Sequence, residues 1–282
     1  MISVIDRTLS IVSGAKDPGA LRRFAEGLFE IGADVLELSE ENYAAFAGDF
    51  PAGNYTVRLS AGSSPASFPG IKRFVSSGSV SRNVVMSEEY YIRDVGMLLS
   101  GAIPPVLRPI RLSLSTPPRD FDVGRVYGAL RETFLGFVEF SPYGDPGVAT
   151  SLASEWILYG GNSVVTTLGG TGGFASLEEM MVFLRSVRRR RPPLKVVAPD
   201  VIRALFRDAF PAEPIPDATP QMKISPCSSI HVIKFKLEES GLGLTGDQIK
   251  AITSSVRAGH RKPSAYLDSD DIRRLAERLR NE

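Results

Sequence analysis

The sequence contains very few of the residues that most often bind metals or form covalent cross-links. Its 282 residues include a single cysteine, Cys227, which excludes an internal disulfide and is typical of a protein from a reducing compartment. The two histidines, His231 and His260, both lie in the C-terminal part of the chain. Neither has a predicted position beside Cys227, so we predict a buried or unreactive thiol and not a catalytic one.

Long apolar runs and an excess of charge of one sign are also absent. No uninterrupted run approaches the roughly 18 apolar residues that a transmembrane helix needs, and residues 1–6 lack the features of a secretory signal. The net charge is +1, which favours neither nucleic acid nor an anionic membrane as a partner. The four-arginine run at 188–191 lies at a predicted helix end, where cations stay solvated. We predict a soluble cytoplasmic protein.

The chain is large enough for one sizeable globular domain. Its composition, 43% hydrophobic and 23% charged, is that of a protein with a substantial core. A (β/α)₈ barrel needs about 250 residues. One barrel with a small appendage therefore fits the length.

The stretch from residue 138 to residue 184 has the clearest order of elements. A short β-prone run and a helix pattern precede the β-branched run at 163–167. A glycine-rich loop at 169–173 then opens a helix whose first turn carries Glu178 and Glu179, the charge sign that a helix N-terminus favours. Consecutive β–α units predict a parallel sheet with its functional loops at the carboxyl ends of the strands.

Strand and helix patterns alternate through the first 190 residues. The predicted strands cover residues 3–9, 33–38, 55–59, 72–75, 108–114, 138–140 and 163–167. The predicted helices cover residues 20–31, 40–46, 87–99, 122–133, 149–159 and the segment after the glycine-rich loop. This gives seven β–α units, one fewer than a (β/α)₈ barrel has. The barrel then closes with seven strands, takes one strand from an unexpected segment, or has an open wall.

The character of the chain changes after residue 191. Proline-rich segments surround a short predicted helix at 199–210, and three amphipathic helices follow at 230–240, 245–256 and 268–280. We predict a (β/α) barrel over residues 1–192, a proline-rich linker with a short helix over 193–222, and a C-terminal helical region over 223–282.

Residues 147–167, GVATSLASEWILYGGNSVVTT, and the triplet Leu177-Glu178-Glu179 form an ordered series of motifs. The series resembles that of the homocitrate synthase and 2-isopropylmalate synthase family of metal-dependent acyltransferases. Members typically read D-L-G-L-A-T, then A-G-A-x-x-V-x-T-T, then G-x-G-x-x-x-G-N-A-x-L-E-E. Residues 234–241 also resemble the helical region that follows the family's barrel. The resemblance implies a TIM-type barrel with a C-terminal helical appendage.

In this family a divalent metal holds a 2-oxo acid while enolised acetyl-CoA attacks its carbonyl. The resemblance places the metal positions at Ile11, Ser141, Tyr143 and Phe174, and the arginine beside the metal at Ser10. Isoleucine and phenylalanine have no donor atom, and neutral serine and tyrosine are poor ligands without carboxylates or imidazoles beside them. We therefore predict that the metal site is lost.

Some substrate-side features of the family remain. Arg111 and Ser113 match the pair that grips the 2-oxo acid carboxylate in homocitrate synthases, and an arginine does so by bidentate hydrogen bonds. The other interpretation is that Arg111 pairs inside the barrel with Glu139, Glu37 or Asp6. Both interpretations stay open on the sequence alone.

Thr167, Gly170 and Gly172 complete the predicted ligand-binding set. The backbone N–H groups of the glycine-rich loop have the chemistry to bind a phosphate or CoA oxygen. A tight strand-to-helix turn that requires positive φ explains the same glycines.

Two functions follow from these observations. The first is a catalytically degenerate homocitrate synthase-like protein that binds a small carboxylate or a partner, as a homodimer or in a complex with an active synthase. The second is an active enzyme of altered chemistry on a 2-oxo acid or other carboxylate, with an acyl-CoA-dependent condensation among the options. Its candidate catalytic residues are Glu139, Glu37 and Asp6. No cofactor is predicted, and acetyl-CoA is implied by the resemblance alone.

Overall fold

The computed structural model describes residues 2–46, 48–76, 85–92, 96, 109–114, 121–134, 136–187, 198–214, 221–225, 228–239, 241–259 and 266–281. The features predicted at Cys227, at His260 and over residues 188–191 lie outside these ranges. None of the helices within them is long and apolar enough to cross a lipid bilayer.

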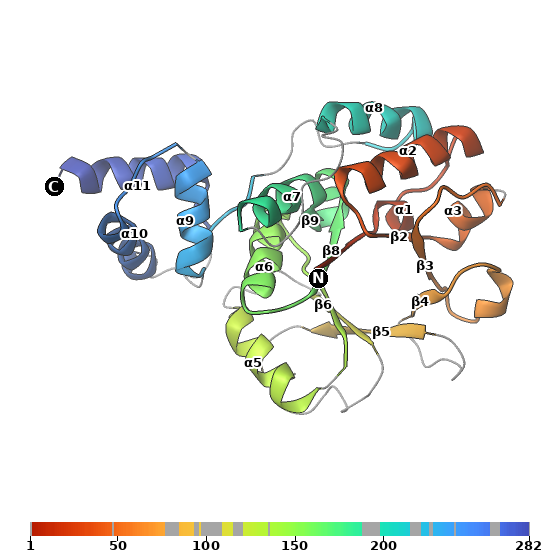
Figure 1. Cartoon of the computed structure of the whole chain (residues 1–282), viewed down its shortest axis with the longest axis horizontal. Coiled ribbons are helices and arrows are strands. Elements are labelled where there is room, and N and C mark those ends of the chain that lie inside the picture. Colours follow the sequence, from red (N-terminus) through yellow and green to blue (C-terminus); the bar gives the residue numbers. More distant parts are fainter. Residues whose placement is uncertain are drawn as a thin grey trace.

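Eight parallel strands form a closed barrel (Figure 1). In chain order they are β1 (Ser3–Asp6), β2 (Val35–Leu38), β3 (Asn54–Arg58), β4 (Arg73–Ser76), β5 (Val85–Ile92), β6 (Ile110–Leu114), β7 (Val138–Ser141) and β8 (Ser163–Thr167). Each strand pairs with the next, and β8 also pairs with β1, with Ser3 opposite Ser163 and Asp6 opposite Thr166. This closure, with helices around it, confirms the predicted TIM-type (β/α) barrel.

The predicted count of seven strands was wrong, because the missing strand lies where we predicted a helix. Ser87-Glu88-Glu89 has the form of a helix cap, yet it lies within β5, which pairs with β4 and β6. The same run contains Tyr90 and Tyr91, whose aromatic rings favour strands. Of the three alternatives for the barrel, a strand from an unexpected segment is the one that the structure has.

The first strand is shorter than the predicted range of residues 3–9. It ends at Asp6, and the short helix α1 (Thr8–Ile11) follows. Asp6 Oδ1 accepts a hydrogen bond of 3.0 Å from the backbone N–H of Thr8, which turns the chain at this point. Side chains after Asp6 therefore lie at the carboxyl end of the barrel and not within its wall.

Most of the helices surround the barrel, and the last three form a group beside it (Figure 1). The described helices after α1 are α2 (Pro18–Ile31), α3 (Glu40–Ala45), α5 (Val123–Thr133), α6 (Pro146–Leu158), α7 (Leu177–Ser186), α8 (Pro199–Ala209), α9 (Ile230–Glu239), α10 (Gly246–Gly259) and α11 (Ser269–Asn281). Short 3₁₀ segments are η1 (Pro65–Ser67) and η2 (Leu168–Gly173), and the two-residue strand β9 (Ala175–Ser176) pairs with β8. Asp17, Asp122, Asp145 and Ser176 accept hydrogen bonds from N–H groups in the first turns of α2, α5, α6 and α7.

The main apolar core lies between the barrel wall and the helices. Phe140 on β7 stacks on Trp156 of α6 with ring centroids 5.0 Å apart. Inside the barrel, Ile5, Val35 and Val165 form a small apolar cluster separate from this core. Val75 is also buried on the inward face of β4, and most other described side chains that point into the barrel are polar or charged.

Helices α8 and α9 pack on outer helices of the barrel, and α10 and α11 pack on α9. Helix α8 lies along α2 (Figure 1), with the rings of Phe206 and Phe24 5.4 Å apart. Helix α9 contacts α7 through Phe235 and Phe183, whose rings lie 5.3 Å apart. The buried Lys236 Nζ also lies 3.4 Å from Glu179 Oε1. The division at residues 192 and 222 stays a prediction.

Candidate functional site

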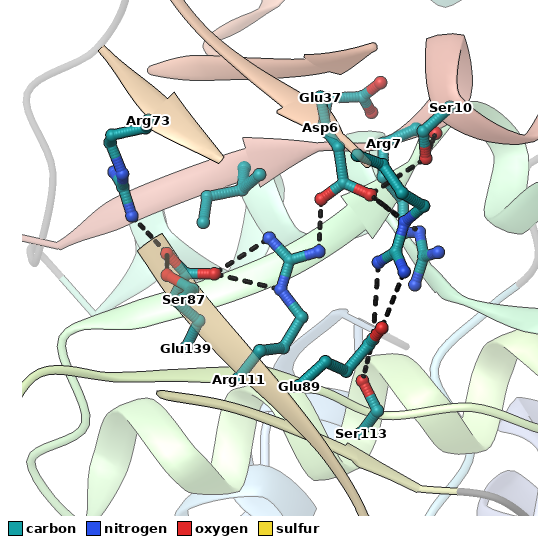
Figure 2. Close-up of polar contacts among 12 residues, drawn as sticks. Asp6, Arg7, Ser10, Glu37, Arg73, Ser87, Glu89, Arg111, Ser113 and Glu139 are labelled. Carbon is teal, nitrogen blue, oxygen red and sulfur yellow. Dashed lines mark hydrogen bonds and ion pairs between the residues drawn. The ribbon is translucent and has the colours of Figure 1, made fainter. Parts of the chain in front are cut away.

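An ion-pair network fills the middle of the barrel, where TIM barrels usually pack branched apolar side chains. Its centre is Arg111 on β6, whose side chain is wholly buried. Arg111 Nη1 donates to Glu37 Oε2, and Nε donates to Glu139 Oε2 at 2.9 Å. Figure 2 shows the guanidinium among its carboxylate partners. Of the two predicted arrangements for Arg111, the structure has the ion pairs within the barrel.

Strand register explains why these side chains meet. Arg111 lies opposite Glu89 of β5 on one side and opposite Glu139 of β7 on the other. Its sequence neighbours Ile110 and Leu112 belong to the outer apolar core. Because successive side chains of a strand point to opposite faces, Arg111 points inward.

A second arginine extends the network toward the carboxyl end of the barrel. Arg58, the last residue of β3, donates to Glu37 Oε1 at 2.8 Å and to Glu89 Oε2 at 2.6 Å. Ser113 Oγ donates to Glu89 Oε1 at 2.6 Å, and Tyr91 donates to Glu89 Oε2 at 3.0 Å. Ser113, predicted to bind a ligand, thus holds a glutamate of the network.

A third arginine extends the network toward the amino end. Arg73, the first residue of β4, donates through Nη2 to Glu139 Oε1 (Figure 2). Ser87 Oγ donates to the same oxygen at 3.0 Å. The chain of contacts Arg73–Glu139–Arg111–Glu37 therefore runs from one end of the barrel to the other.

The arginines hold Glu37 and Glu89 in the ionised form. Burial by itself would raise the pKa of Glu37, but the guanidinium groups of Arg111, Arg58 and Arg7 outweigh it and hold this pKa well below its usual range. For Glu89, too, burial is outweighed, chiefly by Arg58, and the pKa falls to about 2. Carboxylates held in this way are poor general bases at neutral pH.

Among the residues that the structure describes, the network has one more positive than negative side chain. Its arginines are Arg7, Arg58, Arg73 and Arg111, and its glutamates are Glu37, Glu89 and Glu139. Arg7 has the weakest ionic contact, with Nε 3.7 Å from Glu37 Oε1. Burial lowers the pKa of the Arg7 guanidinium to about 10.

Asp6 takes no part in this network in the described structure. Its Oδ1 accepts from Thr8 N, and the buried Oδ2 has no hydrogen-bond partner. Burial raises the pKa of Asp6 to about 7, against the lowering effect of the Thr8 N–H, and the negative charges of Glu178 and Glu37 raise it further. Its chemistry therefore differs from that of Glu37, although both were predicted as candidate catalytic residues.

Three of the four residues at which the resemblance places metal ligands lie together at the carboxyl end of the barrel. The rings of Tyr143 and Phe174 lie 5.4 Å apart, and the two residues form an isolated antiparallel bridge. A Cβ atom added to Gly172 would lie 3.0 Å from Ile11 Cδ1 and 3.4 Å from Phe174 Cε2, so both side chains flank this glycine. Arg7 stacks on Phe174 with Cζ 4.2 Å from the ring centroid, a cation–π contact.

These side chains do not fit a metal ion. Ile11 and Phe174 have no donor atom, and the fourth position, Ser141, is a buried hydroxyl without a hydrogen-bond partner. In the described parts of the chain, no three residues among His, Cys, Asp and Glu come together as ligands. Ser10, where the resemblance implies an arginine beside the metal, donates to Glu37 Oε1 at 3.0 Å.

The glycine-rich loop is bonded mainly to itself and to α7. Gly169 N donates to Glu178 Oε2 at 2.8 Å, Thr167 Oγ1 donates to Thr171 O at 2.9 Å, and Gly170 is buried. Gly172 is exposed. Of the predicted ligand residues in this segment, Thr167 and Gly170 thus lie within a turn that is already closed by hydrogen bonds.

Gly173 is the position where this loop tolerates least change. Its φ is +84°, and an added Cβ would lie 2.6 Å from the carbonyl oxygen of Gly144. We expect Gly173→Ala to lower the free energy of unfolding by about 1–3 kcal/mol, measured by chemical denaturation. The matched control is Gly128→Ala on the surface of α5, where nothing lies within 4 Å of the new methyl group. That change should stabilise the protein by up to about 1 kcal/mol, and equal effects at the two sites would refute the argument.

Sequence reasoning missed four residues of the network: Arg7, Arg58, Arg73 and Glu89. Arg58 and Arg73 lie in correctly predicted strands, where a charged residue among β-branched neighbours signals a polar interior. Glu89 was missed because residues 87–99 were predicted as a helix and not as a strand. Arg7 follows directly after β1.

Comparisons with known proteins do not assign this chain to a family. No family model matches the chain, and no curated protein is similar to it in sequence. Similar solved structures include phosphoribosyl anthranilate isomerase from Thermotoga maritima, with 13% identity and a TM-score of 0.46 over 67% of this chain and 100% of that one. The carboxyl transferase domain of Rhizobium etli pyruvate carboxylase has 12% identity and a TM-score of 0.47, and the match covers 99% of this chain and 60% of that one.

A third similar structure is the N-terminal domain of a proposed aldolase from Bacteroides vulgatus, with 10% identity and a TM-score of 0.49 over 100% of this chain and 97% of that one. At these values the likenesses carry no inference about reaction or ligand. The assignment of the fold rests on the closed strand pairing described above.

Proposed function

We propose that this chain is a homocitrate synthase-like barrel protein that does not run the family's metal-dependent condensation and instead binds a small carboxylate or a partner protein. The observation that carries the proposal is the carboxyl end of the barrel. There, Ile11, Tyr143 and Phe174 gather at the inherited metal positions, and Arg7 stacks on Phe174. An apolar and aromatic group stands where the family has ligands.

The state of Arg111 supports the same proposal. In the family this arginine grips the substrate carboxylate, whereas here Glu37 and Glu139 occupy its guanidinium. A substrate would have to displace buried ion pairs to reach it, and breaking such pairs costs several kcal/mol. The sequence motifs therefore persist while two parts of the family's chemistry, the metal and the carboxylate clamp, have been replaced.

The proposal extends to assembly. Helices α9, α10 and α11 follow the barrel as the resemblance implies, and α9 packs on it through Phe235 and the buried Lys236. We propose that residues 223–282 form the region through which the chain pairs, either with a second copy or with an active synthase subunit.

A second candidate is an enzyme of altered chemistry on a carboxylate, and one observation favours it. The pKa of Asp6, about 7, is the value that a general acid or base needs near neutral pH. An essential Asp6 would show as an activity lost in Asp6→Asn, whereas the non-catalytic proposal expects no activity to lose.

The proposal is tested by turnover and metal binding. The full chain is incubated with acetyl-CoA, a panel of 2-oxo acids including 2-oxoglutarate, and Mg²⁺, Mn²⁺ or Zn²⁺, and CoA release is followed. We expect no release above background and no stoichiometric Zn²⁺ binding by calorimetry. Metal-dependent release of CoA by the native chain would refute the proposal.

The matched comparison is a variant with donors restored at the four positions: Ile11→Asp, Ser141→His, Tyr143→His and Phe174→Asn. Carboxylate and imidazole groups are the ligands that Zn²⁺ prefers. We expect this variant to gain Zn²⁺ binding if its circular dichroism spectrum is native-like, because three of the four side chains already meet at the carboxyl end. Equal Zn²⁺ binding by native and restored chains would contradict the account of the lost site.

A further inference from the structure

A pocket of about 690 Å³ opens at the amino end of the barrel, opposite to the end considered so far. It lies beneath the starts of β1 to β4, and its lining includes Ser3, Asp34, Asn54, Tyr55, Lys72 and Arg73. Ligand pockets in proteins typically measure about 300–1,000 Å³. The pocket is therefore large enough for a small organic molecule, and no part of the proposed function depends on it.

The lining of this pocket favours negative charge. Lys72 is exposed, and Arg73 beside it begins β4. Asp34 is the one acidic residue among the described lining residues, and its Oδ2 accepts a hydrogen bond of 2.8 Å from Val4 N. The pocket lining thus has two cationic side chains and one carboxylate, and that carboxylate already accepts a backbone hydrogen bond.

Arg73 has hydrogen-bonding capacity to spare. A guanidinium offers five N–H groups in a planar fork, and in the described structure Arg73 uses Nη2 for Glu139. Its side chain is 27% exposed and forms part of the pocket lining. This fork matches the geometry of a carboxylate or phosphate group.

The charge of the interior points to the same ligand. The described network has one more arginine than glutamates, and unbalanced charge in a protein interior is costly. Arg58 donates to two glutamates, and Arg7, with its weaker contact, is buried at the opposite end. Arg73 donates to one glutamate and is partly exposed. An anion beside Arg73 would therefore supply the missing negative charge where the network meets solvent.

We propose that the amino-end pocket binds a small organic anion, whose carboxylate or phosphate group lies between Lys72 and Arg73. Binding there draws on the same guanidinium that holds Glu139. The occupant of the pocket is thereby linked to Glu139 and Arg111, and through them to the carboxyl end of the barrel.

The test uses the full chain and four probes: malonate, citrate, inorganic phosphate and uncharged glycerol. Binding is measured by calorimetry at low salt and mapped by amide chemical shifts. We expect at least one anion to bind, glycerol not to bind, and shifts to concentrate at Val35, Asn54 and Lys72. Preference for malonate or citrate over phosphate would identify a carboxylate ligand, and the reverse preference a phosphate ligand.

Two variants and a control sharpen the result. Lys72→Ala removes an exposed charge without touching the interior, and Arg73→Lys keeps the charge but removes the planar fork. Each is expected to weaken anion binding at least tenfold, while Lys16→Ala, an exposed lysine paired with Asp208, leaves it unchanged. Failure of every anion to bind, binding unaffected by Lys72→Ala, or shifts centred on Thr171 at the opposite end would each overturn the proposal. Because Lys72→Ala leaves Glu139 paired, misfolding of the Arg73 variant does not decide the outcome.

Discussion

Replacing Arg111 with methionine is expected to lower the free energy of unfolding by about 3–5 kcal/mol. The side chain is wholly buried and holds Glu37 and Glu139, so its loss removes one cation from each of two buried carboxylates. Methionine keeps much of the volume, which separates the electrostatic loss from the cavity that alanine would create. Urea denaturation followed by tryptophan fluorescence measures the change, because Trp156 is buried in the core.

The control is Arg125→Met on the exposed side of α5, where an arginine has no such role. A surface change of this kind is expected to stay within about 0.5 kcal/mol. If Arg111→Met and Arg125→Met gave the same loss, the buried network would not be a major source of stability. Arg111→Lys should fall between them, since a single ammonium group cannot hold two carboxylates in the way a guanidinium does.

Asp6→Asn is expected to stabilise the protein at pH 8 and to have little effect at pH 4. The pKa of Asp6 is about 7 in the folded protein and near 3.8 in the unfolded chain, so folding disfavours its ionised form. The resulting loss of stability begins as the pH rises above about 4 and is complete above about pH 7. Its upper bound is roughly 4 kcal/mol, from about 1.4 kcal/mol for each pKa unit.

The measurement is the difference in unfolding free energy between Asp6→Asn and the native chain at several pH values. Other titrating groups are present in both proteins, so they largely cancel in this difference. A difference that is independent of pH would show that Asp6 ionises normally. Asp34→Asn is the matched control, because Asp34 also accepts a backbone hydrogen bond from β1 but lies at the open end of the barrel.

Most of the barrel was predictable from sequence because the outward face of its strands is apolar and its helices start at recognisable cap residues. Strands β2, β3 and β6 to β8 carry β-branched and aliphatic residues toward the helices, and Asp17, Asp122 and Ser176 mark helix starts. The predicted strand 163–167 agrees with β8 at both ends. Local propensity and tertiary packing point to the same answer in these segments.

Strand β5 was not predictable by the same reasoning, and the cause is the polar interior. Its inward residues Ser87, Glu89 and Tyr91 face ion pairs, so the strand lacks the apolar alternation by which strands are recognised. Ser87 followed by two glutamates then has the appearance of a helix cap. A charged barrel interior thus removes the alternation of apolar and polar residues by which a strand is recognised in the sequence.

The candidate site was predicted in part for a related reason. Glu37, Arg111 and Glu139 lie in predicted strands, and the structure brings them together. Whether an arginine binds a ligand or a neighbouring glutamate depends on partners from distant strands, here Glu37 and Glu139 at separations of 74 and 28 residues. Asp6 was expected beside these residues, yet its contact is Thr8, because the chain turns immediately after β1.

The position of the start of β1 determines where an affinity tag can be attached without disturbing the amino-end pocket. Ile2 and Ser3, where β1 begins, also line the amino-end pocket, so any peptide fused ahead of them would emerge at its rim. An oligohistidine tag at that position would bring imidazole groups and ordered water into the amino-end pocket. Fusion after residue 282, beyond α11, keeps the tag away from this entrance, and ligand screening should start from that design.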